Sequence, residues 1–499
     1  MTPIAPPIVI VGAGPVGLCL AIDLAMQGVA STVLDRGTGS LEGSRAICWA
    51  KRTLEIFDRL GIGQRVLDKG VTWKTGRVFH GADEIWNFDL LPEDGHRMPA
   101  FVNLQQPYVE RFLAERAAEF PDLIDIRWRS TVTDHEAHED GVRLCVDGPD
   151  GTYDLHAGWM VAADGSRSPI RERMGLRFEG LTFEERFLIA DVKMPSPPFE
   201  SGEPERWFWF KPPFHPGQSA LLHQQPDDIY RIDLQLGADA DPEEEKKPER
   251  VVPRIRQMVG DHPFELDWVS VYRFRCARLD RFVHGRVVFA GDSAHVVSPF
   301  GARGGNGGVQ DADNLAWKLA AVVQGEADAS LMDTYDVERG HAADENIANS
   351  ARATGFMTPK NRHERLFRDA VLDLAHDHPF ARRMVNSGRL SKPASFAGLP
   401  GFERADGPLQ PGEPCVDAPT SRGWLLEHLG TENVVLSIGE AARGTSSDLH
   451  VALGDETPRE GDLVDVEGFV ERRYGRNRTY RIRPDQHVAD VQAARVRAA

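Results

Sequence analysis

Apolar and polar positions change their spacing twice within the first part of the chain. Residues 8–11 (IVIV) form a short apolar run that ends at a glycine-rich turn, residues 12–17 (GAGPVG). Apolar residues then recur at helical spacing as far as residue 24, and a second apolar run ends at Asp35. This pattern predicts a strand, a helix and a second strand, joined by tight turns.

A second change from strand to helix is predicted past the middle of the chain. Residues 287–290 (VVFA) form an apolar run that ends at residues 291–292 (GD). Residues 301–308 (GARGGNGG) contain five glycines, for which we predict a loop that approaches a ligand closely. The helical pattern after this loop would offer free N–H groups and a positive dipole end to an anion. A flexible surface loop ahead of an ordinary helix is the alternative.

Aromatic and polar residues alternate at period two between residues 181 and 275, which predicts a mainly antiparallel sheet. The aromatic side chains could form only a core, or could cover a pocket for a flat substrate near His223 and Arg231. The last ninety or so residues have their own mixed pattern of helix and strand.

These patterns divide the chain into three predicted domains. The first is a nucleotide domain in two parts, residues 1–180 and 276–400, with a short excursion toward the substrate side near residues 72–100. Residues 181–275 form the inserted sheet domain, and residues 401–499 form a small C-terminal domain.

Composition narrows the function classes. The chain has 499 residues and a net charge of −18, with its basic residues scattered, so we expect no nucleic-acid partner. Its five cysteines are far apart and include no C-x-x-C, which argues against a disulfide framework or a metal site and favours the cytoplasm. The apolar run at residues 8–24 contains glycines and an aspartate, so we expect neither a signal peptide nor a membrane span.

The first turn has the spacing G-x-G-x-x-G at Gly12, Gly14 and Gly17, and Asp35 ends the strand that follows. Glycines at these positions form the turn, admit a pyrophosphate and let helix and strand pack closely, while the carboxylate can bind ribose hydroxyls. We therefore predict a dinucleotide site. Arg36 is either a surface charge or a neighbour of the adenosine.

Three further segments could contribute to this site. Arg45 precedes an amphipathic helical pattern, and it could reach a pyrophosphate or stay solvated. Gln105 and Gln106 stand where another helix begins, and they would touch the ligand or cap the turn. Asp164 follows an apolar run and starts an Asp-Gly turn, a common pair that becomes informative beside the other two glycine turns.

The three turns stand in the order found in one family of flavoproteins. GAGPVG with Asp35, the Asp-Gly pair at 164–165 and the Gly-Asp pair at 291–292, followed by PFGARGGNGG, resemble the class A, single-component aromatic monooxygenases. This family is typified by para-hydroxybenzoate hydroxylase and phenol hydroxylase. The tail, with RPDQHVA near its end, resembles the thioredoxin-like domain of the phenol hydroxylase branch. Because the tail has no C-x-x-C, the resemblance implies a structural role or an oligomer contact, such as a homodimer.

The resemblance implies an α/β fold with a Rossmann-like FAD-binding domain, an interleaved and mainly antiparallel sheet for the substrate, and a thioredoxin-like C-terminal domain. It also implies FAD as the cofactor. The residues expected to bind FAD are Gly12, Gly14, Pro15, Val16, Gly17, Asp35, Arg36, Arg45, Gln105, Gln106, Asp164, Gly291, Asp292, Pro299, Gly304, Gly305, Asn306 and Gly307.

The same resemblance implies a course of catalysis. NADH or NADPH would reduce FAD as a transient co-substrate, and O₂ would then form a C4a-hydroperoxyflavin that hydroxylates a phenolic ring. Pro299 would lie beside the flavin, near the place where oxygen reacts. No motif marks a catalytic base, and His223 and Arg231 are candidates by position alone.

Other functions stay open at this point. The same fold could catalyse epoxidation, dehydrogenation or other non-hydroxylating chemistry, or the chain could be a flavin redox sensor without enzymatic activity. Arg303 departs from the usual loop of the family, and it would either steer an anionic substrate or nicotinamide phosphate, or point outward. No motif encodes the identity of the aromatic substrate or the choice between NADH and NADPH.

Overall fold

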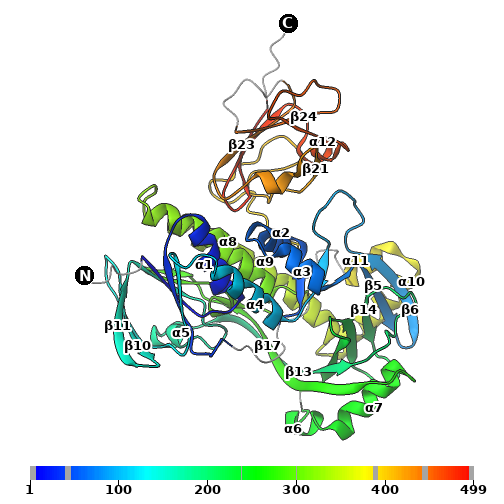
Figure 1. Cartoon of the computed structure of the whole chain (residues 1–499). Coiled ribbons are helices and arrows are strands. Elements are labelled where there is room, and N and C mark those ends of the chain that lie inside the picture. The colour runs from blue at the N-terminus through cyan, green and yellow to red at the C-terminus, as the bar shows by residue number, and fades with distance from the viewer. Residues whose placement is uncertain are drawn as a thin grey trace.

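The computed structural model describes residues 7–39, 46–237, 239–298, 301–385, 392–440 and 448–493, apart from the side chains of residues 184 and 185. It has the predicted α/β fold, with two large sheets and a separate C-terminal sheet (Figure 1). Within these described ranges, no helix is both long enough and apolar enough to cross a membrane.

A six-stranded sheet forms the centre of the nucleotide domain. Its order is β18-β19-β12-β1-β2-β8, and every neighbouring pair is parallel except β18 with β19. All four side chains of β1 are buried, as expected for a strand with helices on both faces of its sheet. The strands are β1 (Ile8–Val11), β2 (Ser31–Leu34), β8 (Ile124–Arg127), β12 (Trp159–Ala162), β18 (Val283–His284) and β19 (Val287–Phe289).

Helices and two small sheets surround this central sheet. The predicted strand, helix and strand over residues 8–35 are confirmed as β1, α1 and β2. The helices are α1 (Pro15–Met26), α2 (Lys51–Arg59), α3 (Gly63–Lys69), α4 (Gln106–Ala117), α5 (Pro169–Arg173), α8 (Gly304–Val323) and α9 (Leu331–Met357). The small sheets combine β3 (Cys48–Ala50), β7 (Phe101–Asn103) and β4 (Val71–Trp73), and β9 (Thr131–Ala137), β10 (Val142–Gly148) and β11 (Gly151–Ala157).

The second large sheet is mainly antiparallel, as predicted. Its order is β20-β17-β13-β16-β15-β14-β5-β6, and only β14 and β5 pair in parallel. Residues before 100 and after 275 supply its edges, so the sheet draws on three separate segments of the chain. Its strands are β5 (Thr75–His80), β6 (Asp83–Asp89), β13 (Glu179–Lys193), β14 (Glu205–Phe210), β15 (Ser219–Gln224), β16 (Ile229–Leu236), β17 (Glu265–Arg278) and β20 (His295–Val296). Helices α6 (Pro242–Glu245), α7 (Pro248–Val259), α10 (Arg362–Asp377) and α11 (Pro379–Val385) complete this part.

The predicted glycine loop over residues 301–308 is wrong for residues 304–308, which form the first turns of α8. Close packing explains the glycines there. A Cβ added to Gly308 would lie 2.7 Å from Val16 Cγ2 and 3.2 Å from Gly291 Cα, and one added to Gly305 would lie 3.2 Å from Ala46 Cβ. The glycines therefore let α8 begin against two neighbouring turns.

The C-terminal domain contains a five-stranded mixed sheet of order β25-β24-β23-β26-β27. In Figure 1 this domain (orange to red) lies on the side of the molecule opposite β13. Its elements are β21 (Pro419–Thr420), β22 (Gly423–Trp424), β23 (Val434–Ile438), β24 (Leu449–Ala452), β25 (Leu463–Val464), α12 (Phe469–Tyr474), β26 (Arg478–Ile482) and β27 (Val488–Ala493). Its buried aliphatic and tyrosine side chains form a separate core.

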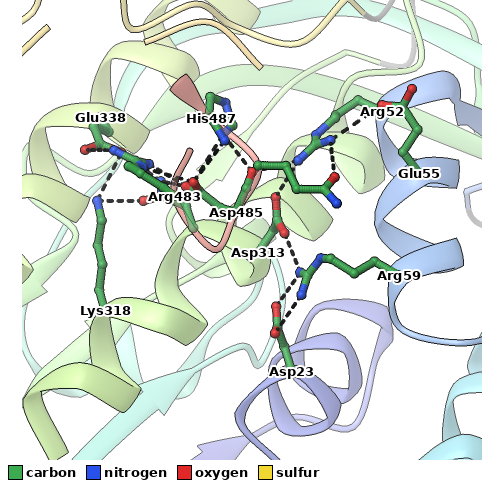
Figure 2. A network of polar contacts seen from close by, with 12 residues as sticks. Asp23, Arg52, Glu55, Arg59, Asp313, Lys318, Glu338, Arg483, Asp485 and His487 are labelled. Carbon is green, nitrogen blue, oxygen red and sulfur yellow. Dashed lines mark hydrogen bonds and ion pairs between the residues drawn. The ribbon is translucent and has the colours of Figure 1, made fainter. Parts of the chain in front are cut away.

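A buried ionic network joins this domain to the nucleotide domain (Figure 2). Arg483, from the turn before β27, donates to both carboxylate oxygens of Glu338 on α9, each at 2.9 Å. Asp485 of the same turn accepts from Asn314 Nδ2 on α8 at 2.9 Å. Arg52 on α2 donates to the main-chain oxygen of Asp485 at 2.8 Å. The C-terminal domain is thus hydrogen-bonded to α2, α8 and α9.

The same network crosses α8 to reach α1. Arg59 donates to Asp23 Oδ2 on α1 and to Asp313 Oδ1 on α8, both at 2.6 Å. Lys318 lies fully buried on α8, with its Nζ 3.0 Å from Glu338 Oε2. Buried charges are costly to desolvate, so each depends on the partner that the fold places beside it.

Lys318 makes the stability of this interface depend on pH. Burial lowers the pKa of Lys318 from 10.5 to about 8, although Glu338 opposes the shift. The folded protein therefore binds fewer protons than the unfolded chain between these two values. We expect the free energy of unfolding to rise by about 3 kcal/mol from pH 8 to pH 10.5, and Lys318→Met to remove that rise.

Urea unfolding at a series of pH values measures the effect. Lys246→Met, which removes a surface lysine on the opposite side of the fold, is the matched control and should retain the rise. An equal rise in the wild type and in Lys318→Met would contradict the role given to Lys318.

Candidate active site

A cavity of about 520 Å³ lies between the nucleotide domain and the eight-stranded sheet. The turn before α1, strand β3 and the first turn of α8 line one side of it, and strands β14 to β17 line the other. The cavity therefore lies where the two predicted halves of the site meet.

The turn before α1 brings backbone atoms into contact. Gly12 has a φ of +115°, and a Cβ added there would lie 2.4 Å from Ala163 O. A Cβ added to Gly17 would lie 1.9 Å from Gly12 O. At Gly14 the nearest atom to an added Cβ is Glu110 Oε1, 3.9 Å away, and Gly14 lines the cavity together with Pro15 and Val16. Gly12 and Gly17 thus serve packing, while Gly14 faces open space.

Asp35 stabilises this turn from the next strand. Its Oδ2 accepts from the main-chain N–H of Ala13 at 2.8 Å, and its Oδ1 accepts from Gly37 N at 2.6 Å. Asp35 is outside the cavity lining, and Arg36 is exposed. Contact of either residue with an adenosine remains a prediction.

The two glutamines occupy different places. Gln106 lines the cavity, where its Oε1 accepts from Ala46 N at 3.1 Å and its Nε2 donates to Glu110 Oε1 at 2.8 Å. Gln105 points elsewhere, with its Nε2 3.4 Å from Pro226 O. Arg45 and Pro299 lie outside the described residues.

Two predicted acids stand at neighbouring strand ends. Asp164 follows β12, and its buried Oδ1 has no hydrogen-bond partner among the described residues. Burial raises the pKa of Asp164 above its ordinary value, against the hydrogen bonds from Ser168 and Ile170 N. Asp292 follows β19, is exposed and lines the cavity. Gly291 beside it has a φ of +64° and donates its N–H to Asp311 Oδ2 at 2.9 Å.

The first turn of α8 presents Gly304, Gly305 and Asn306 to the cavity, but not Gly307. The Asn306 side chain connects α8 to β3, because its Oδ1 accepts from Ala50 N and its Nδ2 donates to Cys48 O, both at 2.9 Å. These bonds hold β3 against the start of the helix.

Arg303 also lines the cavity and is only 6% exposed, so the alternative that it points outward is wrong. Its Nη1 donates to Asn346 Oδ1 on α9 at 2.9 Å. Arg303 therefore anchors the start of α8 to α9 and contributes positive charge to the cavity.

The opposite wall carries a polar row across four strands. Arg206 pairs with His223 in register, His223 with Arg231, and Arg231 with Asp191. The guanidinium of Arg231 donates to both oxygens of Asp191, at 2.8 and 2.9 Å, so an acid holds it in place. Such a bidentate pair makes Arg231 a poor proton acceptor.

His223 is the better candidate for chemistry. Its Nε2 makes no hydrogen bond within the described residues, and Asp233 Oδ2 lies 3.6 Å from it. Its Nδ1 lies 3.8 Å from Cys48 Sγ. Burial and Arg206 lower the pKa of His223, but contacts with Asp233 and Cys48 outweigh them and raise it above its ordinary value. The imidazole is thus prepared to carry a positive charge in the cavity.

Cys48 and Arg206 in this cavity escaped prediction. Cys48 occupies a three-residue strand with no motif around it, and nothing in its local sequence indicates a cation nearby. Arg206 begins the predicted aromatic sheet, and only the pairing of β14 with β15 brings it beside His223. Arg206 could have been predicted only if the register of β14 against β15 had been known.

Comparison with known proteins identifies the fold of the site. A family model described as an FAD binding domain matches residues 6–350. The chain belongs to this FAD-binding family. It is 31% identical over 444 residues to the 3-(3-hydroxy-phenyl)propionate/3-hydroxycinnamic acid hydroxylase of Mycobacterium sp. (strain JLS). The aligned region covers 86% of this chain and 75% of that protein.

Two solved structures share the fold. The p-nitrophenol 4-monooxygenase PnpA from Pseudomonas putida DLL-E4 is 28% identical, with a TM-score of 0.68 over 77% of this chain and 96% of its own. The flavin-dependent monooxygenase PieE, in complex with FAD and substrate, shares the fold over 99% of this chain and 96% of its own, with a TM-score of 0.77 and 21% identity. The predicted family, the cofactor FAD and the enzyme class, a flavin-dependent aromatic monooxygenase, are confirmed.

The residues present fit FAD. Gly14 and Gly304 line the cavity without a side chain of their own, and the N-terminus of α1 has no side-chain cap among the described residues. The unpartnered Oδ1 of Asp164 can accept a hydrogen bond from a hydroxyl group. Free N–H groups and an open helix start suit a pyrophosphate.

The glycine contacts of α8 give a direct test of this site. Gly308→Ala forces a Cβ to within 3.2 Å of Gly291 Cα, so the start of α8 must shift. We expect FAD to bind about tenfold more weakly or worse. Gly340→Ala is the matched control on α9, because an added Cβ there meets nothing within 4 Å. Titration of the apoprotein with FAD, followed by flavin fluorescence, measures both, and equal affinity in Gly308→Ala and wild type would contradict the packing argument.

Proposed function

We propose that this chain hydroxylates a phenolic ring held in the cavity between the start of α8 and the sheet wall that carries His223. NADH or NADPH and O₂ are the proposed co-substrates. The proposal rests on the row from Arg206 to Asp191. In this row His223 Nε2 is buried on the cavity wall opposite the turns of the nucleotide domain, and it makes no hydrogen bond among the described residues. The two relatives named above act on phenols by their names, which supports the same substrate class.

The cofactor and the protein supply different parts of this reaction. When bound, FAD would accept electrons from the nicotinamide and activate O₂. The protein must keep the ring close to that chemistry, exclude water and make the ring electron-rich. The turn residues Gly14, Asp292, Gly304 and Gly305 would hold the cofactor on one side, and the sheet would hold the substrate on the other.

His223 makes the ring electron-rich by stabilising a phenolate. The charged imidazole donates its Nε2–H to the phenolate oxygen, which lowers the pKa of the phenol. Asp233 Oδ2, 3.6 Å from Nε2, and Cys48 Sγ, 3.8 Å from Nδ1, favour the charged imidazole. Arg231 fixes the strand beside His223 through Asp191 and takes no proton.

The charge of the cavity favours an anionic substrate. Five arginines line it, of which Arg231 is paired with Asp191 and Arg303 is bonded to Asn346, while Arg206 has an Nε without a hydrogen bond among the described residues. Against these stand the acids Glu110, Asp233 and Asp292. We therefore propose that the substrate is a phenolate or a phenolic acid and not a neutral, fully apolar ring. The homodimer and the cytoplasmic location stay predictions.

A substrate panel tests the proposed function. FAD-loaded enzyme is given phenol, nitrophenol, hydroxybenzoates and hydroxyphenylpropionates, each with NADH and with NADPH. At least one phenolic anion should accelerate nicotinamide oxidation, with hydroxylated product formed in a ratio near one. Nicotinamide oxidation that yields only peroxide with every phenol would contradict hydroxylation.

The role of His223 predicts a specific loss. His223→Gln should lower kcat/KM for the best phenol by about a hundredfold or more, because the phenolate loses its charged donor, while FAD stays bound. The loss should shrink with substrates whose phenol is already ionised at the assay pH. His135→Gln on β9, outside the cavity lining, is the control and should match the wild type. Unchanged kcat/KM in His223→Gln would remove His223 from the mechanism.

A further inference from the structure

Cys48 is the sulfur of this cavity, and two cations flank it. His223 Nδ1 lies 3.8 Å and Arg206 Nη1 lies 3.7 Å from its Sγ. All three side chains line the cavity and are less than 8% exposed. The contacts come from strands β14 and β15 of the sheet, on the opposite side of the cavity from β3. The sulfur therefore stands in a positively charged, partly enclosed environment.

Hydrogen bonds to α8 hold the backbone around Cys48 in place. Cys48 O accepts from Asn306 Nδ2 on α8, and Ala50 N donates to Asn306 Oδ1, both at 2.9 Å. Cys48 also lies opposite Asn103 in the pairing of β3 with β7. The backbone that carries the sulfur is thus fixed against the start of α8.

A second observation shows that this corner is built to meet a ligand. His223 Nε2 and Arg206 Nε are buried and make no hydrogen bond within the described residues. Because both side chains line the cavity, a ligand bound there can supply the missing partner. His223 and Arg206, which flank the sulfur, are therefore also able to bind an oxygen atom of a ligand.

The protonation of the cluster agrees with this geometry. Burial opposes ionisation of the Cys48 thiol, but Arg206 and His223 outweigh it and hold the pKa of the thiol below its ordinary value. Three other cysteines show the opposite effect. Burial raises the pKa of Cys19, Cys276 and Cys415 above the ordinary value of a thiol. A thiolate, and not a thiol, is the nucleophile in oxidation by peroxides.

We propose that Cys48 is a peroxide-sensitive thiolate in the cavity wall, which hydrogen peroxide converts to a sulfenic acid. Hydrogen peroxide is the expected by-product whenever reduced flavin reacts with O₂ and no substrate is hydroxylated. Oxidation of Cys48 would then slow an enzyme that turns over without productive substrate.

The step balances with the groups present. The thiolate sulfur attacks one oxygen of hydrogen peroxide and forms the S–O bond, while the O–O bond breaks. Sulfur is oxidised by two electrons, and the departing oxygen leaves as hydroxide, which takes a proton from the His223 imidazolium and becomes water. Arg206 keeps its charge and stabilises the oxygen on sulfur. The new oxygen lies near the Nδ1 side of the His223 ring, and a thiol reductant restores the thiolate.

Peptide mass spectrometry tests the proposal on the FAD-loaded enzyme. Hydrogen peroxide is added without nicotinamide and removed with catalase, and sulfenic acid is then trapped with dimedone in denaturant. We expect Cys48 to be labelled at peroxide concentrations about tenfold below those that label Cys145, the partly exposed cysteine of β10. Labelling of Cys145 first, or no labelling of Cys48, would overturn the proposal. Because peroxide is added, the result does not depend on the proposed hydroxylation.

Two variants separate the thiolate from its surroundings. Whatever its own starting rate of nicotinamide oxidation, Cys48→Ser should keep that rate after peroxide, whereas the wild type should lose its rate and regain it with a thiol reductant. His223→Gln should slow dimedone-detected oxidation of Cys48 about tenfold, because the thiolate and its proton donor are both lost. Oxidation of Cys48 at the wild-type rate in His223→Gln would contradict the pairing.

The wild type alone gives an independent readout if a variant fails to fold. The rate at which iodoacetamide alkylates Cys48 should fall less from pH 8.5 to pH 6.5 than the rate of an ordinary thiol, which falls by more than tenfold over that range. The charged groups that face the sulfur or its imidazole partner are Arg206, His223, Arg231 and Asp233. A fall at Cys48 as steep as that of an ordinary thiol would overturn the proposal.

Discussion

The close approach of three backbone segments is the constraint on which this molecule depends. The turn before α1, the turn after β19 and the first turns of α8 meet at distances that admit no side chain. A Cβ at Gly17 would lie 1.9 Å from Gly12 O, and one at Gly308 would lie 3.2 Å from Gly291 Cα. Glycine at these positions lets the three segments meet, and we propose that their main-chain N–H groups, not side chains, hold the dinucleotide.

Buried charges hold α8 in the position that this packing requires. Asp311 near its start accepts from Gly291 N, from Arg339 at 2.7 Å and from His295 at 2.6 Å. Farther along, Asp313 and Lys318 join the network that binds the C-terminal domain. One helix thus connects the cavity, the central sheet and the C-terminal domain. The C-terminal domain is hydrogen-bonded to α2, α8 and α9, and its role, structural or as an oligomer contact, stays a prediction.

The sequence was sufficient where chemistry is local. A turn that needs backbone contact must use glycine, so residues 12–17 and 291–292 could be recognised with their flanking strands. The same logic failed at residues 304–308, because glycines that permit close helix packing look like those of a flexible loop. Local pattern also could not show that Asp35 and Gln105 bond to the protein outside the cavity lining.

The substrate side was less predictable for a different reason. Arg206, His223, Arg231 and Asp191 form one row only because four strands pair in a particular register, and Cys48 reaches them from the other side of the cavity. Register depends on turns and on packing over the whole sheet, and a single sequence does not encode it in any motif. Arg303 illustrates the same limit, since its place was decided by Asn346 on a distant helix.

The central claim is that one oxygen atom from O₂ is inserted into a phenolic ring in this cavity. Turnover of the FAD-loaded enzyme with its best phenol under ¹⁸O₂, followed by mass spectrometry of the product, tests it directly. We expect one ¹⁸O atom in the new hydroxyl group of the product, and one nicotinamide oxidised for each product formed. A product that carries oxygen only from water, or oxidised nicotinamide with all ¹⁸O in peroxide, would contradict it.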